Sequence, residues 1–218
     1  MYFRDRAEAG DKLADQLMNY RWENTAVMAV SPNGVLVGEQ IARRLHCELS
    51  LLLTARITAP GEESLVIGTL DQTGIFNYNS MISAGEMEEY MQDMRSHVEQ
   101  EKMTQMYKMA SVVGAGGLAD PAQLEGRNVI IATDGVKNGM SFDAALQFLN
   151  HIHVEKIIAA IPVGQAEVIE RLHGLVDEMH YLYIPENFFT VSHYYEEPSI
   201  KDPAEVMSHI DNVISRWI

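Results

Sequence analysis

The chain has 218 residues, 47% of them hydrophobic and 22% charged, which suits one folded domain with a sizeable core. Its formal net charge of −15 excludes binding of duplex nucleic acid through clustered lysines and arginines. Cys47 is the only cysteine, which excludes an intrachain disulfide or a cysteine-based zinc site.

The first residues, MYFRDRAEAG, are charged and lack the apolar core of a signal peptide. No apolar run approaches the length needed to span a membrane. Together with the single cysteine, these features predict a cytoplasmic protein with no membrane partner.

The first part of the chain predicts a helix followed by a strand–helix–strand unit. Apolar residues at helical spacing predict a helix over residues 5–20. The run TAVMAV, residues 25–30, predicts a buried strand, the turn signal SPNG follows it, and VLVGEQIARRL predicts the next helix. The run ELSLLLTA, residues 48–55, predicts a second buried strand. Within one sheet such a unit is parallel and right-handed.

The middle of the chain predicts a hairpin and a long helix. SLVIGTL and TGIFNYN are strand candidates joined by a turn at residues 71–74. Residues 85–110 predict one charged helix with a row of methionines, which we interpret as packing rather than as metal ligands. The same face could form a contact between two copies in a homodimer. The glycine-rich residues 111–126 predict a flexible connector.

From residue 128 onward, strands and helices alternate again. Strands are predicted over 128–133, 156–163 and 178–184, and helices over about 140–150, 165–173 and from about 202. The whole pattern predicts an α/β fold with an open, mostly parallel central sheet flanked by helices. Ligands of such sheets bind beyond the carboxyl ends of the strands, so the loops after Val30, Ala55, Thr133 and Val163 are candidate sites.

The loop after residues 128–133 is the strongest candidate for binding an anion. Gly135 and Gly139 permit a positive φ and close approach of the backbone to a ligand. Ser141 falls at the start of a helix, where its hydroxyl and the first N–H groups can bind a phosphate. Lys137 could add a point charge. The same turn could also merely join a strand to a helix, with Ser141 as an ordinary N-cap.

The segment VIIATDGVKNGMS resembles the signature of type I phosphoribosyltransferases, in which two acids and a small loop follow a buried strand. FRDRAEAGDKLADQL, ARITAPGEESLVIGTL and PENFFTVSHYYEE resemble a bacterial branch of that family, in the same order and with the same gaps. The resemblance covers essentially the whole chain. It implies a single domain over residues 1–218, with a parallel core sheet and a small hood contributed by residues of about 1–20 and 183–218.

The resemblance also implies a reaction: transfer of phosphoribosyl from phosphoribosyl pyrophosphate (PRPP), bound with Mg²⁺, to a nitrogenous acceptor. Asp134 would bind the ribose diol, and Mg²⁺ would be held through PRPP, with Asp134 as a possible ligand. Arg56, with the amides of Asn33 and Gly34, would meet the charge of the pyrophosphate. The ligand-binding loop would comprise Thr133, Asp134, Gly135, Val136, Lys137, Asn138, Gly139, Met140 and Ser141.

Five positions depart from the family pattern. Thr133 replaces the first diol-binding acid, Pro32 lies where the branch has an arginine, Asn138 replaces a threonine, and Lys137 replaces a small residue or an acid. After the second strand, where the branch has Arg-Lys, Ala55 and Arg56 leave one cation. Since one lost oxyanion donor costs about 10²–10³ in rate, these changes support an alternative. In that alternative, the protein is catalytically degenerate and acts as a nucleotide sensor or as a regulatory or scaffold subunit. A third possibility is a hydrolase that acts on a phosphorylated ribose.

The remaining cations near the N-terminus are weaker candidates. Arg4 and Arg6, in the segment FRDR, match the N-terminal segment of the family and could lie near the hood. We interpret both mainly as part of a solvated face.

Overall fold

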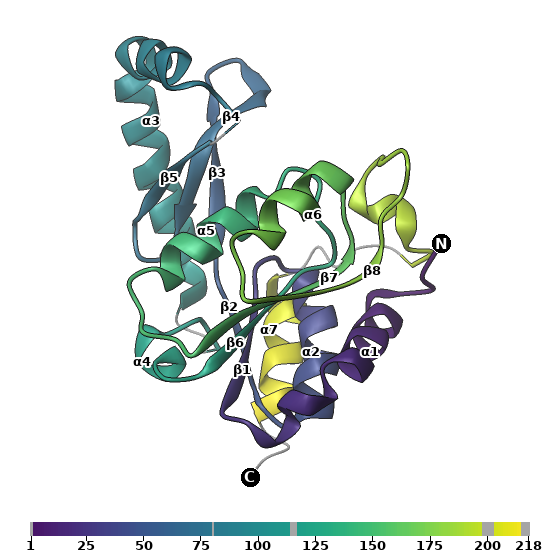
Figure 1. The fold of residues 1–218 in the computed structure, drawn as a ribbon. Coiled ribbons are helices and arrows are strands. Elements are labelled where there is room, and N and C mark those ends of the chain that lie inside the picture. Colours follow the sequence, from purple (N-terminus) through teal and green to yellow (C-terminus); the bar gives the residue numbers. More distant parts are fainter. Residues whose placement is uncertain (1, 80, 114–116, 198–202, 215–218) are drawn as a thin grey trace.

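The computed structural model describes residues 2–79, 81–113, 117–197 and 203–214, and it shows one main sheet between two layers of helices (Figure 1). The main sheet has five parallel strands in the order β2 (Glu48–Leu51), β1 (Thr25–Ala29), β6 (Asn128–Ala132), β7 (Lys156–Val163) and β8 (Glu178–Tyr183). One face is covered by α1 (Arg6–Gln16), α2 (Gly34–Leu45) and α7 (Pro203–Ile214), and the other by α4 (Pro121–Leu124), α5 (Met140–Leu149) and α6 (Ala166–His173). The predicted α/β fold is confirmed.

Strand β1 shows why the central strands are mostly apolar in sequence. All five of its residues are buried. Val27 and Ala29 belong to the core shared with α1, α2 and α7, whereas Ala26 and Met28 belong to the core shared with α5 and α6. Because successive side chains point to opposite faces and both faces are covered, a polar residue at any of these positions would be buried in one core or the other.

The strand order reverses beside β1, which has β2 on one side and β6 on the other. Ala29 pairs with Ala132 across the β1–β6 ladder, and the Val30 N–H donates to the Ala132 carbonyl oxygen at 3.0 Å. The loops that follow β1 and β6 therefore leave the sheet side by side. This is the topological switch point at which open α/β sheets bind ligands.

A second, antiparallel sheet comprises β3 (Thr54–Ala59), β4 (Glu62–Asp71) and β5 (Phe76–Tyr78). The long helix α3 (Ala84–Val113) packs along it, and this small sheet and its helix project from the rest of the chain (Figure 1). The predicted hairpin and long helix are confirmed. Among the described residues, no helix is long and apolar enough to cross a membrane.

The prediction of one strand over residues 48–55 is wrong, because the chain changes sheets within this run. Strand β2 ends at Leu51 and β3 begins at Thr54. Between them, the Leu53 N–H donates to Gln72 Oε1 at 3.0 Å, and Gln72 Nε2 donates to the Ala119 carbonyl oxygen at 2.6 Å. The break thus depends on residues distant in the sequence, and the run LLL contains no local signal for it.

The projecting part of the described chain comprises residues 54–79 and 81–113, whereas the resemblance placed a hood at about 1–20 and 183–218. Helices α1 and α7 of those expected segments pack on the main sheet through residues such as Leu13 and Ile210, because their apolar faces complete its core. Parts of the expected hood and of the predicted connector lie outside the described residues: 198–202, 215–218 and 114–116.

The methionine row of α3 faces the small sheet. Its side chains pack with those of β3 and β4 in one apolar cluster, which includes Met87, Met91, Met94, Met106 and Met109. The interpretation of this row as packing is therefore confirmed. Met103 and Tyr107 of the same helix are exposed. A homodimer contact on this helix stays a prediction.

Two short 3₁₀ helices complete the chain trace. Met18–Trp22 follows α1, so the predicted helix over residues 5–20 is interrupted after Gln16. Val191–Tyr194 follows β8, and just beyond it Tyr195 forms a parallel bridge with Phe3. This bridge brings the N-terminal segment to the loop that follows the last strand of the main sheet.

Candidate functional site

A pocket of about 400 Å³ lies at the carboxyl ends of β1 and β6. Of the predicted ligand-binding residues, Gly34 does not line it, whereas the others do: these are Asn33, Arg56 and the run from Thr133 to Ser141. Sequence reasoning missed Ser31, Thr190 and Val191, which also line it. The loops after β1 and β6 meet here because their strands are neighbours at the switch point. Thr190 and Val191 belong to a third segment, which follows β8.

The loop after β1 is built around the hydroxyl of Ser31. Ser31 Oγ accepts a hydrogen bond from the Gly34 N–H at 2.9 Å, which caps the start of α2. A Cβ at Gly34 would lie 2.8 Å from that oxygen and 3.0 Å from the Ala132 carbonyl oxygen, so only glycine fits. The Gly34 N–H, which was expected to face a pyrophosphate, already has a partner within the protein, and Gly34 lies outside the pocket lining, so its contact with a ligand stays a prediction. Asn33 does line the pocket.

The loop after β6 is held in place by its own backbone. The Val136 N–H donates to the Val163 carbonyl oxygen at 2.9 Å, so it is not available to a ligand. Thr133 Oγ1 lies 3.3 Å from the Gly135 nitrogen and 3.2 Å from the Gly135 carbonyl oxygen. A Cβ at Gly135 would approach side-chain carbons of Val163 and Val191 to 2.9 Å. The glycine is required because the loop is packed between these two residues.

The start of α5 offers donors to the pocket. Gly139 is the N-cap with φ 75°, and Met140 and Ser141 are the first helical residues. The first N–H groups of a helix have no partner within it, and the helix dipole makes this end favourable for an anion. The side-chain oxygen of Asn138 takes one of these groups, since it accepts from the Met140 N–H at 3.2 Å.

Two cations of the described chain line the pocket, Arg56 and Lys137. Lys137 is exposed on the loop itself, and Arg56 is exposed on β3, so the small sheet contributes to a pocket in the main sheet. Within the described parts of the chain, neither side chain forms an ion pair or a hydrogen bond. Both charges are therefore available to an anionic ligand.

Asp134, the one acid that the described residues bring to the lining, has both carboxylate oxygens engaged by the protein. Arg6 Nε donates to Oδ2 at 3.2 Å, and Ser31 Oγ donates to Oδ1 at 3.2 Å. The Tyr195 hydroxyl donates to the Asp134 carbonyl oxygen at 2.6 Å. Burial raises the pKa of the Asp134 carboxyl, against the opposing effect of the Arg6 guanidinium and of Ser31. The Asp134 carboxylate, which was predicted to bind a ribose diol, therefore already accepts hydrogen bonds from Arg6 and Ser31.

Arg6 itself was expected on a solvated face, and that expectation is wrong. Its side chain is only 1% exposed, whereas Arg4, two residues earlier, is exposed and pairs with Asp5. The guanidinium of Arg6 lies 4.4 Å from the centre of the Tyr195 ring. A cation at the first residue of a helix is disfavoured by the helix dipole, and this was the one sequence signal of a special role.

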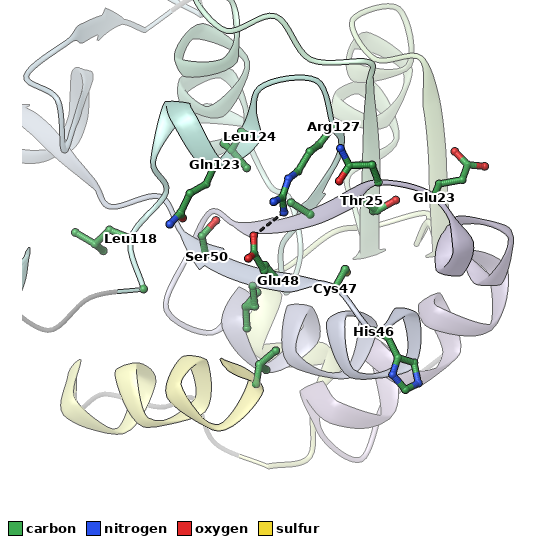
Figure 2. A pocket seen from close by; sticks show the side chains of 15 residues that line it. Glu23, Thr25, His46, Cys47, Glu48, Ser50, Leu118, Gln123, Leu124 and Arg127 are labelled. Atoms are coloured by element: carbon green, nitrogen blue, oxygen red, sulfur yellow. Dashed lines mark hydrogen bonds and ion pairs between the residues drawn. The ribbon is translucent and has the colours of Figure 1, made fainter. Parts of the chain in front are cut away.

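A larger pocket, of about 600 Å³, lies at the opposite, amino-terminal ends of the strands (Figure 2). Its charged lining residues include Glu23 and Glu48, and the guanidinium of Arg127 is paired with Glu48 at 2.5 Å. Figure 2 shows this pair beside the edge strand, with Cys47 and Gln123 nearby. Because Arg127 and Glu48 neutralise each other and Glu23 adds a negative charge, this pocket is unfavourable for an anion, so the smaller pocket is the candidate site.

The sequence model of the phosphoribosyl transferase domain family matches residues 4–197, which include all three loops of the pocket. The chain belongs to this family. The match extends from the segment that contains Arg6 to the residues just beyond Tyr195.

Similar proteins agree with the assignment to the phosphoribosyl transferase family. Two curated proteins from strains of Mycobacterium tuberculosis, provisionally named phosphoribosyl transferases, are each 26% identical over 210 residues. The alignment covers 96% of this chain and 46% of each relative, so the chain spans about half their length. The crystal structure of TT1426 from Thermus thermophilus is 28% identical, with a TM-score of 0.75 over 96% of this chain and 98% of that one.

The Mg²⁺ that phosphoribosyl transferase chemistry implies finds no carboxylate cage among the described residues of this pocket. Asp134 is the one carboxylate that they bring to the lining, and Arg6 and Ser31 occupy its oxygens. Across the part of the chain that the structure describes, no group of three or more His, Cys, Asp or Glu side chains could hold a metal ion. The side chains present therefore do not fit a protein-held Mg²⁺.

Proposed function

We propose that this phosphoribosyl transferase domain binds PRPP or another ribose 5-phosphate compound, with the 5′-phosphate on the loop of residues 135–141. The observation that carries the proposal is the charge of the pocket. In a chain with a net charge of −15, the described lining offers two positive charges without an ion pair, Arg56 and Lys137, and its one acid is neutralised by Arg6. Such a local arrangement attracts an anion that the overall field of the protein repels.

The loop supplies the contacts that a phosphate monoester needs. The N–H groups at the start of α5, the Ser141 hydroxyl and the Lys137 ammonium would surround the phosphate oxygens. Arg56, which reaches the pocket from β3, would lie opposite the pyrophosphate of PRPP. In the transfer, the bond between ribose C1 and the pyrophosphate oxygen breaks, and a nitrogen of the acceptor bonds to C1. Arg56 would stabilise the negative charge that develops on the leaving pyrophosphate.

In this proposal Mg²⁺ enters as part of the Mg²⁺–PRPP complex and neutralises pyrophosphate charge there. A calorimetric titration with Mg²⁺–PRPP and with ribose 5-phosphate tests the binding. Saturable heat with the wild type, and a loss of affinity in the Lys137→Ala variant, is expected. No heat from either compound with a folded protein would contradict the proposal.

A second candidate is a domain that binds the phosphorylated ligand but no longer transfers it, as a sensor or regulatory subunit. The observation in its favour is that Asp134 and the Gly34 N–H, two groups expected to contact PRPP, are bonded within the protein. Release of pyrophosphate from PRPP in the presence of a panel of purines, pyrimidines and ammonium separates the two candidates. If the wild type binds but does not react, whereas the Pro32→Arg, Thr133→Asp variant does, the second candidate is correct.

A further inference from the structure

A further pocket, of about 480 Å³, lies beyond the carboxyl end of β8, where the start of the chain lies beside the loop that follows this strand (Figure 1). Its lining comes from Tyr2, from the last residue of β8 and from the segment of residues 184–194. A volume of this size suits a small molecule. The described residues that line it are different from those of the candidate phosphate pocket, so the two pockets are separate sites.

The wall of this pocket is mainly aromatic. Five of its lining residues carry rings: Tyr2, Tyr183, Phe189, His193 and Tyr194. The centre of the Tyr194 ring lies 6.1 Å from those of Tyr2 and Tyr183 and 5.2 Å from that of His193. The side chains of Tyr2 and Phe189 are 58% and 60% exposed. Large apolar rings gathered in one concave and exposed patch indicate a binding site.

The rings are held in place by the protein itself. The Phe3 N–H donates to the Tyr194 carbonyl oxygen at 2.8 Å, which fixes Tyr2 beside the segment that follows β8. The hydroxyl of the buried Tyr194 donates to the Asn187 carbonyl oxygen at 3.2 Å and accepts from the Phe189 N–H at 3.3 Å. A wall that is ordered before a ligand arrives loses little conformational entropy on binding.

The charge of the pocket is negative. Among the described residues that line it, Glu186 is the one carboxylate, and none is a lysine or an arginine. Glu186 is exposed, and the chain as a whole carries a net charge of −15. The faces of aromatic rings are also negative, so they attract a cation placed over them. This pocket therefore favours the opposite charge from the phosphate pocket, which Arg56 and Lys137 make positive.

We propose that this aromatic pocket binds the ammonium head of a small organic cation, for which choline is the simplest probe. The ring faces contact the methyl groups of the head, and Glu186 provides the opposite charge. A neutral planar ring could stack on the same side chains, but it would make no use of Glu186. The inference is independent of the proposed function, because it concerns different residues.

The first test compares choline with 3,3-dimethylbutan-1-ol, its uncharged isostere, in titrations followed through backbone amide NMR signals. Choline should give saturable shifts centred on residues 183–194, and the alcohol should bind about tenfold more weakly, because it has the same shape but no charge. Equal affinities for the two compounds, or no saturable shift of these amides with choline, would overturn the inference.

The second test removes the ring and the charge separately. Phe189→Leu keeps an apolar side chain but loses the ring face, and Glu186→Gln loses only the charge. Each should weaken choline by about three- to tenfold, whereas Glu186→Gln should leave the affinity for the alcohol unchanged. Both residues are exposed, so both variants should fold. Wild-type affinity for choline in both variants would contradict the inference.

Two exposed residues outside this pocket provide matched controls. Tyr181→Leu removes an aromatic ring of β8, and Glu125→Gln removes an acid at the end of α4. Both should bind choline as the wild type does. If Glu125→Gln weakens choline as much as Glu186→Gln does, the effect arises from the overall charge, which contradicts the inference.

A titration with adenine tests the rival ligand, a neutral planar ring. Adenine that shifts the same amides, binds more tightly than choline and is unaffected by Glu186→Gln would assign the pocket to stacked rings and overturn the inference. Weaker binding of adenine than of choline supports a cation site.

Discussion

The side-chain oxygen of Asn138 lies 3.2 Å from the backbone nitrogen of Met140 and accepts its hydrogen bond, so the candidate phosphate loop caps its own helix. We predict that Asn138→Ala lowers the free energy of unfolding by about 1 kcal/mol, the usual loss for a missing cap. Urea denaturation measures this loss. The affinity for ribose 5-phosphate should not fall, because the Met140 N–H becomes available to the ligand. A tenfold or larger drop in affinity would mean that the Asn138 side chain itself binds the phosphate.

Gly139 is predicted to be irreplaceable for two separable reasons. Its φ of 75° is unfavourable for any residue with a Cβ, and a Cβ would lie 2.5 Å from Arg171 Nη2 and 3.0 Å from a side-chain carbon of Val168. Arg171 cannot move freely, because it donates to both carboxylate oxygens of Asp143 at 2.6 and 3.1 Å. Gly139→Ala should therefore lower both the stability and the phosphate affinity.

Gly126→Ala is the matched control for that variant. Gly126 has nearly the same φ, 68°, but a Cβ there would meet no described atom within 4 Å. We expect Gly126→Ala to lose only the conformational part, about 1–2 kcal/mol, with unchanged phosphate affinity. Equal losses in the two variants, in urea denaturation and in phosphate titration, would show that the contact with Arg171 is unimportant.

Arg56 and Lys137 should each contribute to ligand affinity through charge. Arg56→Gln is expected to weaken the binding of PRPP about tenfold or more, because one hydrogen bond to a charged group is lost. It should affect ribose 5-phosphate less than PRPP, since Arg56 is assigned to the pyrophosphate. Lys137→Gln should weaken both ligands alike.

Calorimetric titrations of Arg56→Gln and Lys137→Gln are compared with a titration of the control Arg44→Gln. This control removes an exposed arginine of α2 that pairs with Asp15. This control should leave both affinities unchanged. If it weakens PRPP as much as Arg56→Gln does, the effect arises from the overall charge of the protein and not from the pocket.

The pair of Arg6 and Asp134 predicts a characteristic pH dependence of stability. Removal of one partner from a buried ion pair costs about 3–5 kcal/mol, and Arg6→Gln should approach this loss at pH 7. Without the opposing effect of the Arg6 guanidinium, burial raises the pKa of Asp134 further in the folded state, although the hydrogen bond from Ser31 still opposes it. The folded variant then retains a proton that the unfolded chain has released, so its stability falls as the pH rises above about 4, the usual pKa of aspartate.

Urea denaturation of Arg6→Gln at a series of pH values between 4 and 7 measures this dependence. Asp134→Asn in the Arg6→Gln background removes the titrating group and should flatten the curve. A loss of stability in Arg6→Gln that is the same at every pH would show that Asp134 does not remain buried and unpaired.

The sequence predicted the elements of the main sheet well because their signals are local. Runs such as TAVMAV are buried on both faces, and the turn SPNG separates a strand from a helix, so each element can be inferred from a short window. The break at residues 52–53 was missed because Gln72, which receives the Leu53 N–H, is supplied by a distant part of the chain.

The site was predicted in part for the same reason. The phosphate loop could be inferred from its glycines and from the family pattern. Nearly all the residues expected at the site line one pocket. The partners of Asp134 could not, because Arg6 and Tyr195 are separated from it by 128 and 61 positions.

Binding of a phosphate by the loop after β6 can be followed through backbone amide NMR signals in a titration with ribose 5-phosphate. We predict saturable shifts of the amides of residues 137–142, with little change around Glu48 and Arg127 in the opposite pocket. Shifts centred on that opposite pocket, or no saturable shift of the loop amides, would contradict it.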